Sequence, residues 1–343
     1  MPIIGLDLGR HNFRAVEIEK SRDKTTLHKF ASLENPHLNL DSDSKDEIKN
    51  YSEALKQFYV DSDFSSPRVV ISLPEQQVFM RVIKTPTMND KDLANFIKFE
   101  AEQYIPLPMK EVNLSYQKLD IDPLDKEKMN VQIVAAKKTI VEKYIEIVKG
   151  AKLTPVAVEP ETLSIARALG DTEQSPNGTI ILNIGFNYSL IIIVYKGFVM
   201  FTRNLSIGGD TFTKAVSQEL KMDYQQAEEY KKAYGMDAGQ AEGKVSEVLK
   251  PLFDQMISEI KRSRIFFTTN NPNVTINRMI ISGGTAQMPG ILFYFANNLD
   301  IEVEVANPWK GVTISPKLKV QKDHLFAQGP IYSTSYGLAI KGI

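Results

Sequence analysis

The first third of the chain alternates short apolar runs with turn residues, a pattern typical of β-strands. The runs at Ile3–Leu8, Arg14–Glu19 and Thr26–Leu33 predict a meander of three strands. A polar stretch over 34–49 follows. Apolar residues then recur at three- and four-residue spacing and predict a helix with the inner face Ile48, Tyr51, Leu55, Phe58 and Tyr59. Val69–Leu73 predicts a buried strand before Pro74.

Residues 78–152 show a different order of predicted elements: a strand, a helix, two longer strands and a second helix. The first helix follows Asn89 and stops at Pro106, and its apolar face is Leu93, Phe96, Ile97, Ala101 and Tyr104. The second begins near Thr139 and is capped by Gly150. This content predicts a small α+β module inserted into a larger domain.

The second half of the chain repeats the opening motif. Residues 179–207 predict three strands, and Gly208-Gly209 opens a helix. A long packed helix is predicted over 245–260, with Pro251 as a kink or a start. Gly5–Gly9 and Ile181–Gly185 each end a strand in a glycine turn before another strand. This repeated motif suggests a duplicated fold with a cleft between its halves, although many unrelated strands also end in a glycine turn.

Composition excludes several classes of function. The 343 residues include 41 Lys plus Arg and 42 Asp plus Glu, a net charge of −1, so no nucleic-acid partner is expected. Cysteine is absent, and the sequence holds no P-loop and no zinc-hydrolase motif. The histidines are scattered: His11, His28, His37 and His324. Because Lys196 interrupts Leu190–Phe201 and the first residues form no leader, we expect a cytoplasmic protein without direct membrane insertion.

The glycine turns are candidates for anion binding, because glycine lets backbone N–H groups approach a phosphate closely. An acid before such a turn, as at Asp7, can hold Mg²⁺ through water. Each glycine pair alone is more simply explained as a turn. The order Asp-x-Gly, Asn-x-Gly, Gly-Gly-Asp, Ser-Gly-Gly strengthens the functional interpretation, and it resembles the actin-like ATPase superfamily.

The connecting segments resemble the PilM family of type IV pilus proteins. They are Phe99–Pro108, Glu111–Gln117, Pro155–Ala168, Phe201–Arg203, Ile207–Gly209, Ala227–Lys231, Asn307–Pro308 and Tyr336–Ala339. The resemblance implies an α/β actin-like ATPase fold with two ribonuclease H-like lobes around a nucleotide cleft. It assigns 1–77 and 153–175 to subdomain 1A, with the helix 331–343 packing back on it, and 78–152 to subdomain 1C. Subdomain 2A takes 176–212 and 274–330, and subdomain 2B takes 213–273.

Matching positions imply ATP and Mg²⁺ in the cleft. The first phosphate hairpin would be Asp7, Gly9, Arg10, His11, Asn12 and Arg14, with Asp7 holding the metal through water. The second would be Asn183, Gly185 and Ser189. Gly208, Gly209 and Asp210 would lie near ribose and phosphate, Glu228 and Lys231 near adenosine, and Gly283, Gly284 and Thr285 under the base.

Several of these residues depart from the family pattern. Arg10-His11 stand where two serines are usual, Arg14 replaces a frequent lysine, and Asn183 and Glu159 each replace an aspartate. Glu159 is the one candidate catalytic residue. Asn183 cannot act as a base, so hydrolysis should be slow or absent. Arg10 either neutralises the phosphates or occupies their place. Alternatively, Arg10 and His11 face solvent and the protein is an ordinary, active ATPase.

The resemblance implies a scaffold that binds the N-terminal cytoplasmic tail of PilN and couples the inner-membrane platform to the pilus motor. The tail would lie between the first lobe and subdomain 1C, with 78–120 as the candidate wall, although Phe79, Tyr104 and Tyr116 are better interpreted as core aromatics. A division protein like FtsA is the alternative. The chain stops at Ile343 directly after the last expected helix, without an amphipathic membrane helix, which argues against that alternative. A small-molecule kinase would need a base beside a sugar pocket, and only Glu159 is available.

Overall fold

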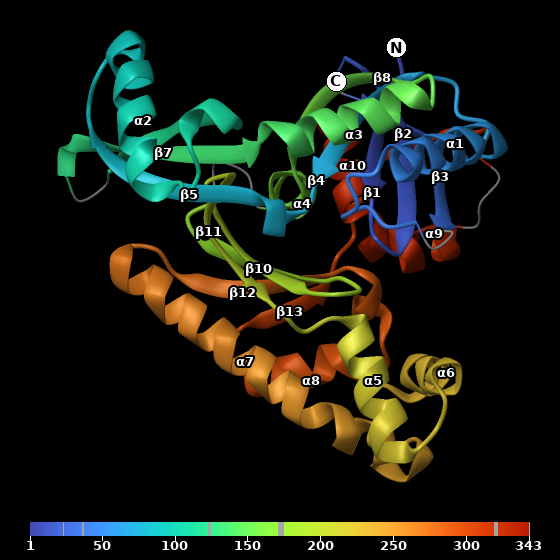
Figure 1. Ribbon diagram of the computed structural model, residues 1–343. Coiled ribbons are helices and arrows are strands. Elements are labelled where there is room, and N and C mark those ends of the chain that lie inside the picture. Colours follow the sequence, from blue (N-terminus) through green and yellow to red (C-terminus); the bar gives the residue numbers. More distant parts are fainter. Residues whose placement is uncertain (23, 36–37, 123–124, 171–174, 319–321, 343) are drawn as a thin grey trace.

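Two mixed β-sheets with the same strand order face each other across the molecule (Figure 1). The computed structural model describes residues 1–22, 24–35, 38–122, 125–170, 175–318 and 322–342, so His37 and parts of the expected subdomain ranges lie outside it. The first sheet contains β1 (Ile3–Leu8), β2 (Asn12–Ser21), β3 (Lys24–Glu34), β4 (Arg68–Leu73), β8 (Thr154–Pro160) and β14 (Thr313–Ile314). The second contains β9 (Gly178–Ile184), β10 (Ser189–Tyr195), β11 (Phe198–Leu205), β12 (Ile276–Ser282) and β13 (Glu302–Val305).

The strand orders confirm the duplication predicted from the glycine turns. The order β3-β2-β1-β4-β8 in the first sheet corresponds to β11-β10-β9-β12-β13 in the second. In both sheets the first three strands of this order are antiparallel, and the remaining pairs are parallel. Each lobe therefore presents one glycine hairpin, β1–β2 or β9–β10, at the corresponding place in its sheet.

Alternate residues of β1 face opposite layers of the first lobe. Ile4, Leu6 and Leu8 pack against α1 (Lys45–Asp61) and α3 (Lys138–Gly150). Ile3 packs on the other face with α10 (Ser333–Lys341). The period of two in a strand makes this possible, since successive side chains point to opposite faces. Helix α10 therefore packs back on the first lobe, as the family resemblance implied.

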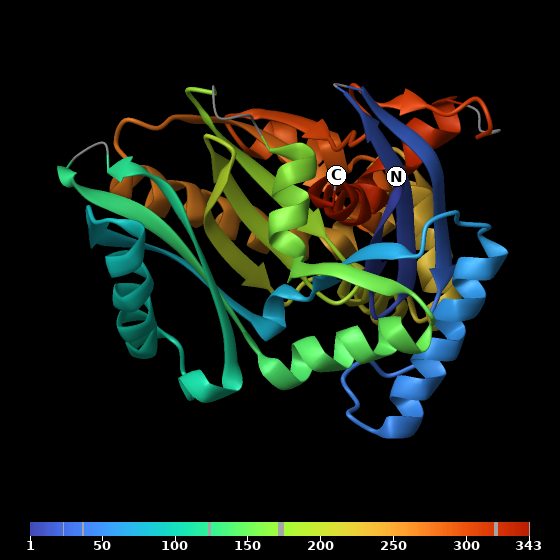
Figure 2. The ribbon, with the colours of Figure 1, turned by 90° about the horizontal axis from the view of Figure 1, so that it is seen from above.

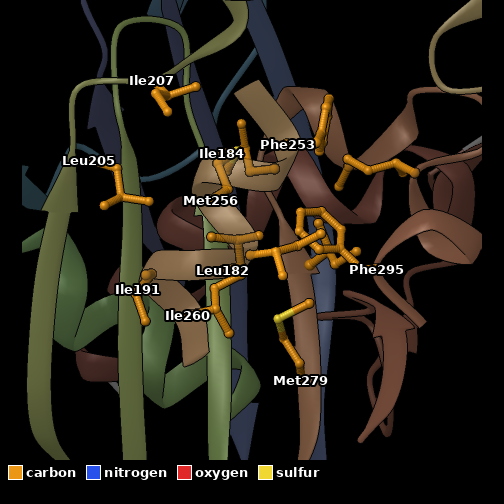
Figure 3. Packing of buried hydrophobic residues seen from close by; sticks show 14 of the residues in the cluster. Leu182, Ile184, Ile191, Leu205, Ile207, Phe253, Met256, Ile260, Met279 and Phe295 are labelled. Atoms are coloured by element: carbon orange, nitrogen blue, oxygen red, sulfur yellow. The ribbon is translucent and has the colours of Figure 1, made fainter. Parts of the chain in front are cut away.

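The second sheet is covered by helices on both faces. Figure 3 shows one core, where α7 (Lys244–Asn270) packs Phe253, Met256 and Ile260 against β-strand residues such as Leu182 and Ile191. The helices α5 (Gly209–Leu220), α6 (Tyr224–Tyr234) and α8 (Ile291–Asn298) complete this face. On the other face α4 (Glu161–Leu169) lies between the sheets and also contacts α10. Pro251 lies inside α7 and is not its start.

A third, three-stranded sheet lies beside the lobes. Its order is β5-β7-β6, and α2 (Asp90–Tyr104) covers one face through Leu93 and Ile97. The strands are β5 (Val78–Pro86), β6 (Val112–Asp122) and β7 (Asp125–Lys137). The remaining helices are α9 (Lys322–Gln328) and the short η1 (Glu75–Gln77), η2 (Met109–Glu111), η3 (Ala241–Gly243), η4 (Gly284–Gln287) and η5 (Gly329–Tyr332).

Helix α3 packs with the first lobe and not with the small sheet, which differs from our expectation of one module over 78–152. Tyr144, Ile147 and Val148 share a core with α1, and Figure 2 shows the two helices side by side. The physical reason is that α2 already covers the apolar face of the small sheet. By its packing, the small sheet module therefore ends at Lys137. No helix among the described residues is long and apolar enough to cross a bilayer.

Candidate functional site

A cavity of about 600 Å³ lies between the two lobes, within the usual range for a small-molecule site. Both glycine hairpins line it, together with the starts of α5 and α10, one face of α6 and the turn after β12. Gly9 and Gly185 stand at matching places in the two hairpins. A Cβ at Gly9 would lie 2.7 Å from Asn12 O, so only glycine fits this turn.

The first hairpin brings an acid and a cation together at the cavity wall. Ser72 Oγ donates a hydrogen bond to Asp7 Oδ1 at 2.8 Å, and Arg14 lies opposite Asp7 in the strand register. Burial raises the pKa of Asp7, while Arg14 and Ser72 act to lower it. Burial also lowers the pKa of Arg14, whose Nε is enclosed without a hydrogen-bond partner. Arg14 also lines the cavity and gives this wall a positive charge.

The tips of the two hairpins touch each other across the cavity. The His11 imidazole from the first hairpin stacks on the Phe186 ring from the second, with centroids 4.2 Å apart and planes 3° from parallel. Burial lowers the pKa of His11, which favours the neutral ring at pH 7. Arg10 is turned toward Asp41, with 2.9 Å between Arg10 Nη2 and Asp41 Oδ1. The hairpins are therefore joined by aromatic contact, and Arg10 already has an acidic partner.

Helix α6 supplies a buried cation on the second lobe. Lys231 Nζ lies 2.6 Å from Glu228 Oε2 and donates to Gly209 O at 3.1 Å. Burial lowers the pKa of Lys231. Partial burial acts to raise the pKa of Glu228, but hydrogen bonds from Lys231 and Thr213 outweigh it and lower the pKa to about 2. The pair therefore remains ionised beside the start of α5.

The turn after β12 brings backbone close to the cavity. Gly283 has φ +86°, and a Cβ there would lie 2.3 Å from Ile184 O, so the β9 backbone excludes any larger residue. A Cβ at Gly284 would meet nothing within 4 Å, which shows open space at this wall. Gly283 N also donates to Pro330 O at 3.1 Å, which ties this turn to the segment before α10.

The structure brings most of the expected site residues together. Those that line the cavity are Asp7, Gly9, Arg10, His11, Asn12, Arg14, Asn183, Gly185, Gly209, Glu228, Lys231, Gly283, Gly284 and Thr285. They come from both lobes and from five separate chain segments. Whether they bind a nucleotide stays a prediction.

Four expected residues do not line the cavity. Ser189 is fully buried and donates to Ile207 O at 2.6 Å. Gly208 packs beneath the second hairpin, where a Cβ would lie 2.4 Å from Phe186 O. Asp210 faces Lys214 at 2.7 Å and accepts from Tyr224 at 3.0 Å. Glu159 is 4% exposed, with Arg167 Nη1 at 2.6 Å and Lys341 Nζ at 3.0 Å, so its carboxylate is occupied elsewhere.

Glu161 is a cavity residue that sequence reasoning missed. Tyr188 Oη donates to Glu161 Oε1, and Glu75 N donates to the same oxygen at 2.9 Å. Burial raises the pKa of Glu161 to about 7. Ser72, Phe186 and Tyr188 were also missed. Phe186 and Tyr188 follow Gly185 in the hairpin, and Ser72 lies one residue before the end of β4, the strand beside β1. Sequence neighbourhood and strand pairing were therefore the available signals.

The described residues contain no group of three or more acidic or histidine side chains that could hold a metal directly. Asp7 and Asn183 both line the cavity. A cation held through water by one carboxylate fits this arrangement, because Mg²⁺ keeps several of its own waters.

The comparisons with known proteins agree with this geometry. The sequence pattern of the family described as type IV pilus assembly protein PilM matches residues 5–343. The chain belongs to the PilM family. A solved structure of a PilM–PilN type IV pilus biogenesis complex has a TM-score of 0.83 and 25% identity, and the match covers 99% of this chain and 98% of that one. The actin-like fold implied by the sequence is thus confirmed.

Two further proteins resemble this chain more distantly, one in fold and one in sequence. The structure of MreB 5 of Spiroplasma citri bound to AMPPNP has a TM-score of 0.54 and 12% identity over 99% of this chain and 95% of that chain, a likeness of fold alone. Cell division protein FtsA of Bacillus subtilis is 24% identical over 228 residues, 60% of this chain and 48% of FtsA. The chain thus matches about half the length of FtsA, and the division alternative is not favoured.

Proposed function

We propose that this chain is a nucleotide-binding scaffold of the type IV pilus inner-membrane assembly platform. The single observation that carries the nucleotide part is the cavity between two glycine hairpins, with Arg14 in its wall. Two glycine hairpins with a cation beside them suit a polyphosphate, and the open wall at Gly284 suits a flat base. Relatives of this fold include MreB 5 bound to AMPPNP, which supports the choice of ATP.

Asp7 would hold Mg²⁺ through water, with Asn183 as a neutral neighbour from the other hairpin. The metal would shield the phosphate charges when bound. Arg14 would place its positive charge beside the phosphates, since it lines the cavity next to Asp7. Glu228 and Lys231 would lie near the adenosine.

Hydrolysis should be slow or absent in this scaffold. Asn183 cannot accept a proton from water at neutral pH. Glu159 is bound by Arg167 and Lys341 away from the cavity. Glu161 lines the cavity, yet Tyr188 and the Glu75 N–H both donate to its Oε1. None of these three residues therefore offers a free carboxylate that could act as a base in the cavity.

The second part of the proposal is that this chain binds the N-terminal tail of PilN. Binding would take place at the cytoplasmic side of the inner membrane. The solved PilM–PilN complex resembles this chain along nearly its whole length, which supports that partner. The candidate wall over 78–120 contains β6, an edge strand of the small sheet that could gain an extended peptide. Tyr116 on β6 is 37% exposed, so it is available to a partner, contrary to the core role that we favoured.

Calorimetric titration of the nucleotide-free protein tests both parts. We expect micromolar binding of ATP with Mg²⁺, negligible phosphate release by the same sample, and separate binding of a synthetic PilN N-terminal tail. A scrambled tail peptide is the control. Absence of nucleotide binding would refute the nucleotide part alone, and absence of peptide binding would refute the PilN part alone. Ready phosphate release would restore the active-ATPase alternative.

A further inference from the structure

The segment 38–44 forms a bridge between the first hairpin and the small sheet. At one end Asp41 pairs with Arg10 at the cavity edge, where their side chains are 48% and 34% exposed. Asn35, just before the segment, donates from Nδ2 to Arg10 O at 2.8 Å and to Leu38 O at 3.1 Å. The hairpin backbone and the segment therefore share a hydrogen-bonded anchor.

The other end of the segment is held by α3. Lys143 is 7% exposed, and its Nζ donates to Leu40 O at 2.9 Å, Ser42 O at 3.3 Å and Asp43 Oδ1 at 2.8 Å. A buried ammonium with three acceptors holds the backbone firmly, because each lost bond would leave a desolvated charge.

The segment also touches the chain on the other side of the small sheet. Gln77 Nε2 lies 3.4 Å from Asp41 Oδ1, and Gln77 is the last residue before β5. Lys143 lies in the helix that follows β7 without a break. Both connections between the first lobe and the small sheet therefore contact 38–44, and Asp41 Oδ1 accepts from Arg10 and Gln77 together.

We propose that Asp41 and a bound phosphate chain compete for Arg10, and that segment 38–44 transmits the outcome to the small sheet. This rests on the proposed nucleotide function. A guanidinium binds a phosphate through two parallel hydrogen bonds, whereas a partly exposed ion pair contributes little. Phosphates in the cavity therefore draw Arg10 away from Asp41. The Asp41 carboxylate then loses its cationic partner and keeps the long contact with Gln77 Nε2, and the segment loosens around Asp41.

Removing the competitor tests this idea. The variant Asp41→Asn should bind ATP and ADP about two- to fivefold tighter, because the cost of breaking the Arg10 pair disappears. Adenosine carries no phosphate, so its affinity should be unchanged. Asp43→Asn is the matched control: it removes the same charge two residues away, where Lys143 and not Arg10 is the partner. Asp41→Glu should keep wild-type affinity.

Hydrogen exchange measured by mass spectrometry supplies the second readout. In the wild type, ADP should speed amide exchange over 38–44, and Asp41→Asn should show the fast exchange without nucleotide. Equal ADP affinity in both proteins, with no change in exchange, would overturn the inference while leaving nucleotide binding intact. Nucleotide binding by Asp41→Asn but not by the wild type would support the inference. Binding by neither protein would overturn the proposed nucleotide function and this inference with it.

Discussion

At the scale of single residues, the two hairpins differ in charge at equivalent positions. Asp7 and Asn183 each stand two residues before the hairpin glycine, and both line the cavity. A carboxylate brings a negative charge to Mg²⁺ and can accept a proton, whereas the amide brings no charge and does not accept a proton at neutral pH. The duplication therefore provides one acid where a symmetric site would have two, which is the basis of the slow hydrolysis that we propose.

Restoring the second acid should raise ATP turnover. We expect Asn183→Asp to increase phosphate release above the wild-type background by about tenfold or more, since a positioned base contributes about 10²–10⁴-fold when fully effective. The measurement is phosphate release at saturating ATP with and without Mg²⁺. Asn187→Asp adds the same charge in the turn of this hairpin and is the control. Equal gains in both variants would mean that charge alone, and not a base at 183, is responsible.

Glu75 should make stability depend on pH. It is 8% exposed, accepts from Thr162, and burial raises its pKa from 4.5 to about 7. Between these values the folded protein holds a proton that the unfolded chain has released. Stability is therefore greatest below the unfolded pKa and falls as pH rises through this window, by roughly 1–3 kcal/mol from this group.

Urea unfolding at about pH 5 and about pH 8 tests this assignment to Glu75. Glu75→Gln replaces the protonated acid with a neutral side chain of the same shape, so its stability should fall less over this range than that of the wild type. Glu102→Gln, at an exposed position of α2, should leave the wild-type pH dependence unchanged. An equal loss of stability in Glu75→Gln and in the wild type would show that another group carries the proton.

At the scale of elements, α10 approaches its neighbours too closely for side chains at two glycines. A Cβ at Gly337 would lie 1.8 Å from Ser164 O in α4, and one at Gly5 would lie 1.8 Å from Ser335 O in α10. Arg167 Nη1 also donates to Gly337 O at 2.8 Å. Because α4 lies between the sheets, this contact fixes α10 against the helix that joins both lobes.

Gly337→Ala should therefore destabilise the fold by about 1–3 kcal/mol or more, because backbone atoms must move to admit the methyl group. The gain in helix propensity, about 1 kcal/mol, opposes this only in part. The free energy of unfolding in urea is the measurement. Gly284→Ala, where a Cβ meets no atom within 4 Å, is the matched control and should stay near wild type. Similar losses in both variants would contradict the steric argument.

Sequence periodicity was a good guide to which helices and strands form. It was a poorer guide to which other elements they pack against. The apolar face of α3 was visible in the sequence, but its partner α1 lies far away in the chain, so periodicity could not exclude the small sheet. The prediction that Glu159 lies at the site could not be checked from the sequence for a related reason. Its ion-pair partner Lys341 is in the last helix, far away in the chain. The positions of the glycine turns could be predicted because a tight turn is local and hairpin geometry follows from neighbouring residues.

At the scale of the whole molecule, the cavity is shared by two lobes, which contact each other through several groups around it. Gln132 Nε2 donates to Val199 O at 2.8 Å on the side of the small sheet, and Ser282 Oγ lies 2.9 Å from Ser333 Oγ beside α10. The His11–Phe186 stack joins the hairpin tips. We expect a polyphosphate to enter between the hairpin tips and to separate these two rings, so that lobe opening controls nucleotide exchange.

Phe186→Ser should speed both association and dissociation of nucleotide. An aromatic pair contributes about 0.5–1.5 kcal/mol beyond its buried area, which corresponds to a rate increase of about two- to tenfold if the stack must break before passage. Stopped-flow mixing with a fluorescent ATP analogue measures both rates. Phe186→Tyr keeps a stacking ring and should keep wild-type rates, and Phe326→Ser removes a ring outside the cavity. Unchanged rates in Phe186→Ser would show that nucleotide enters from another side, with the hairpin tips closed throughout.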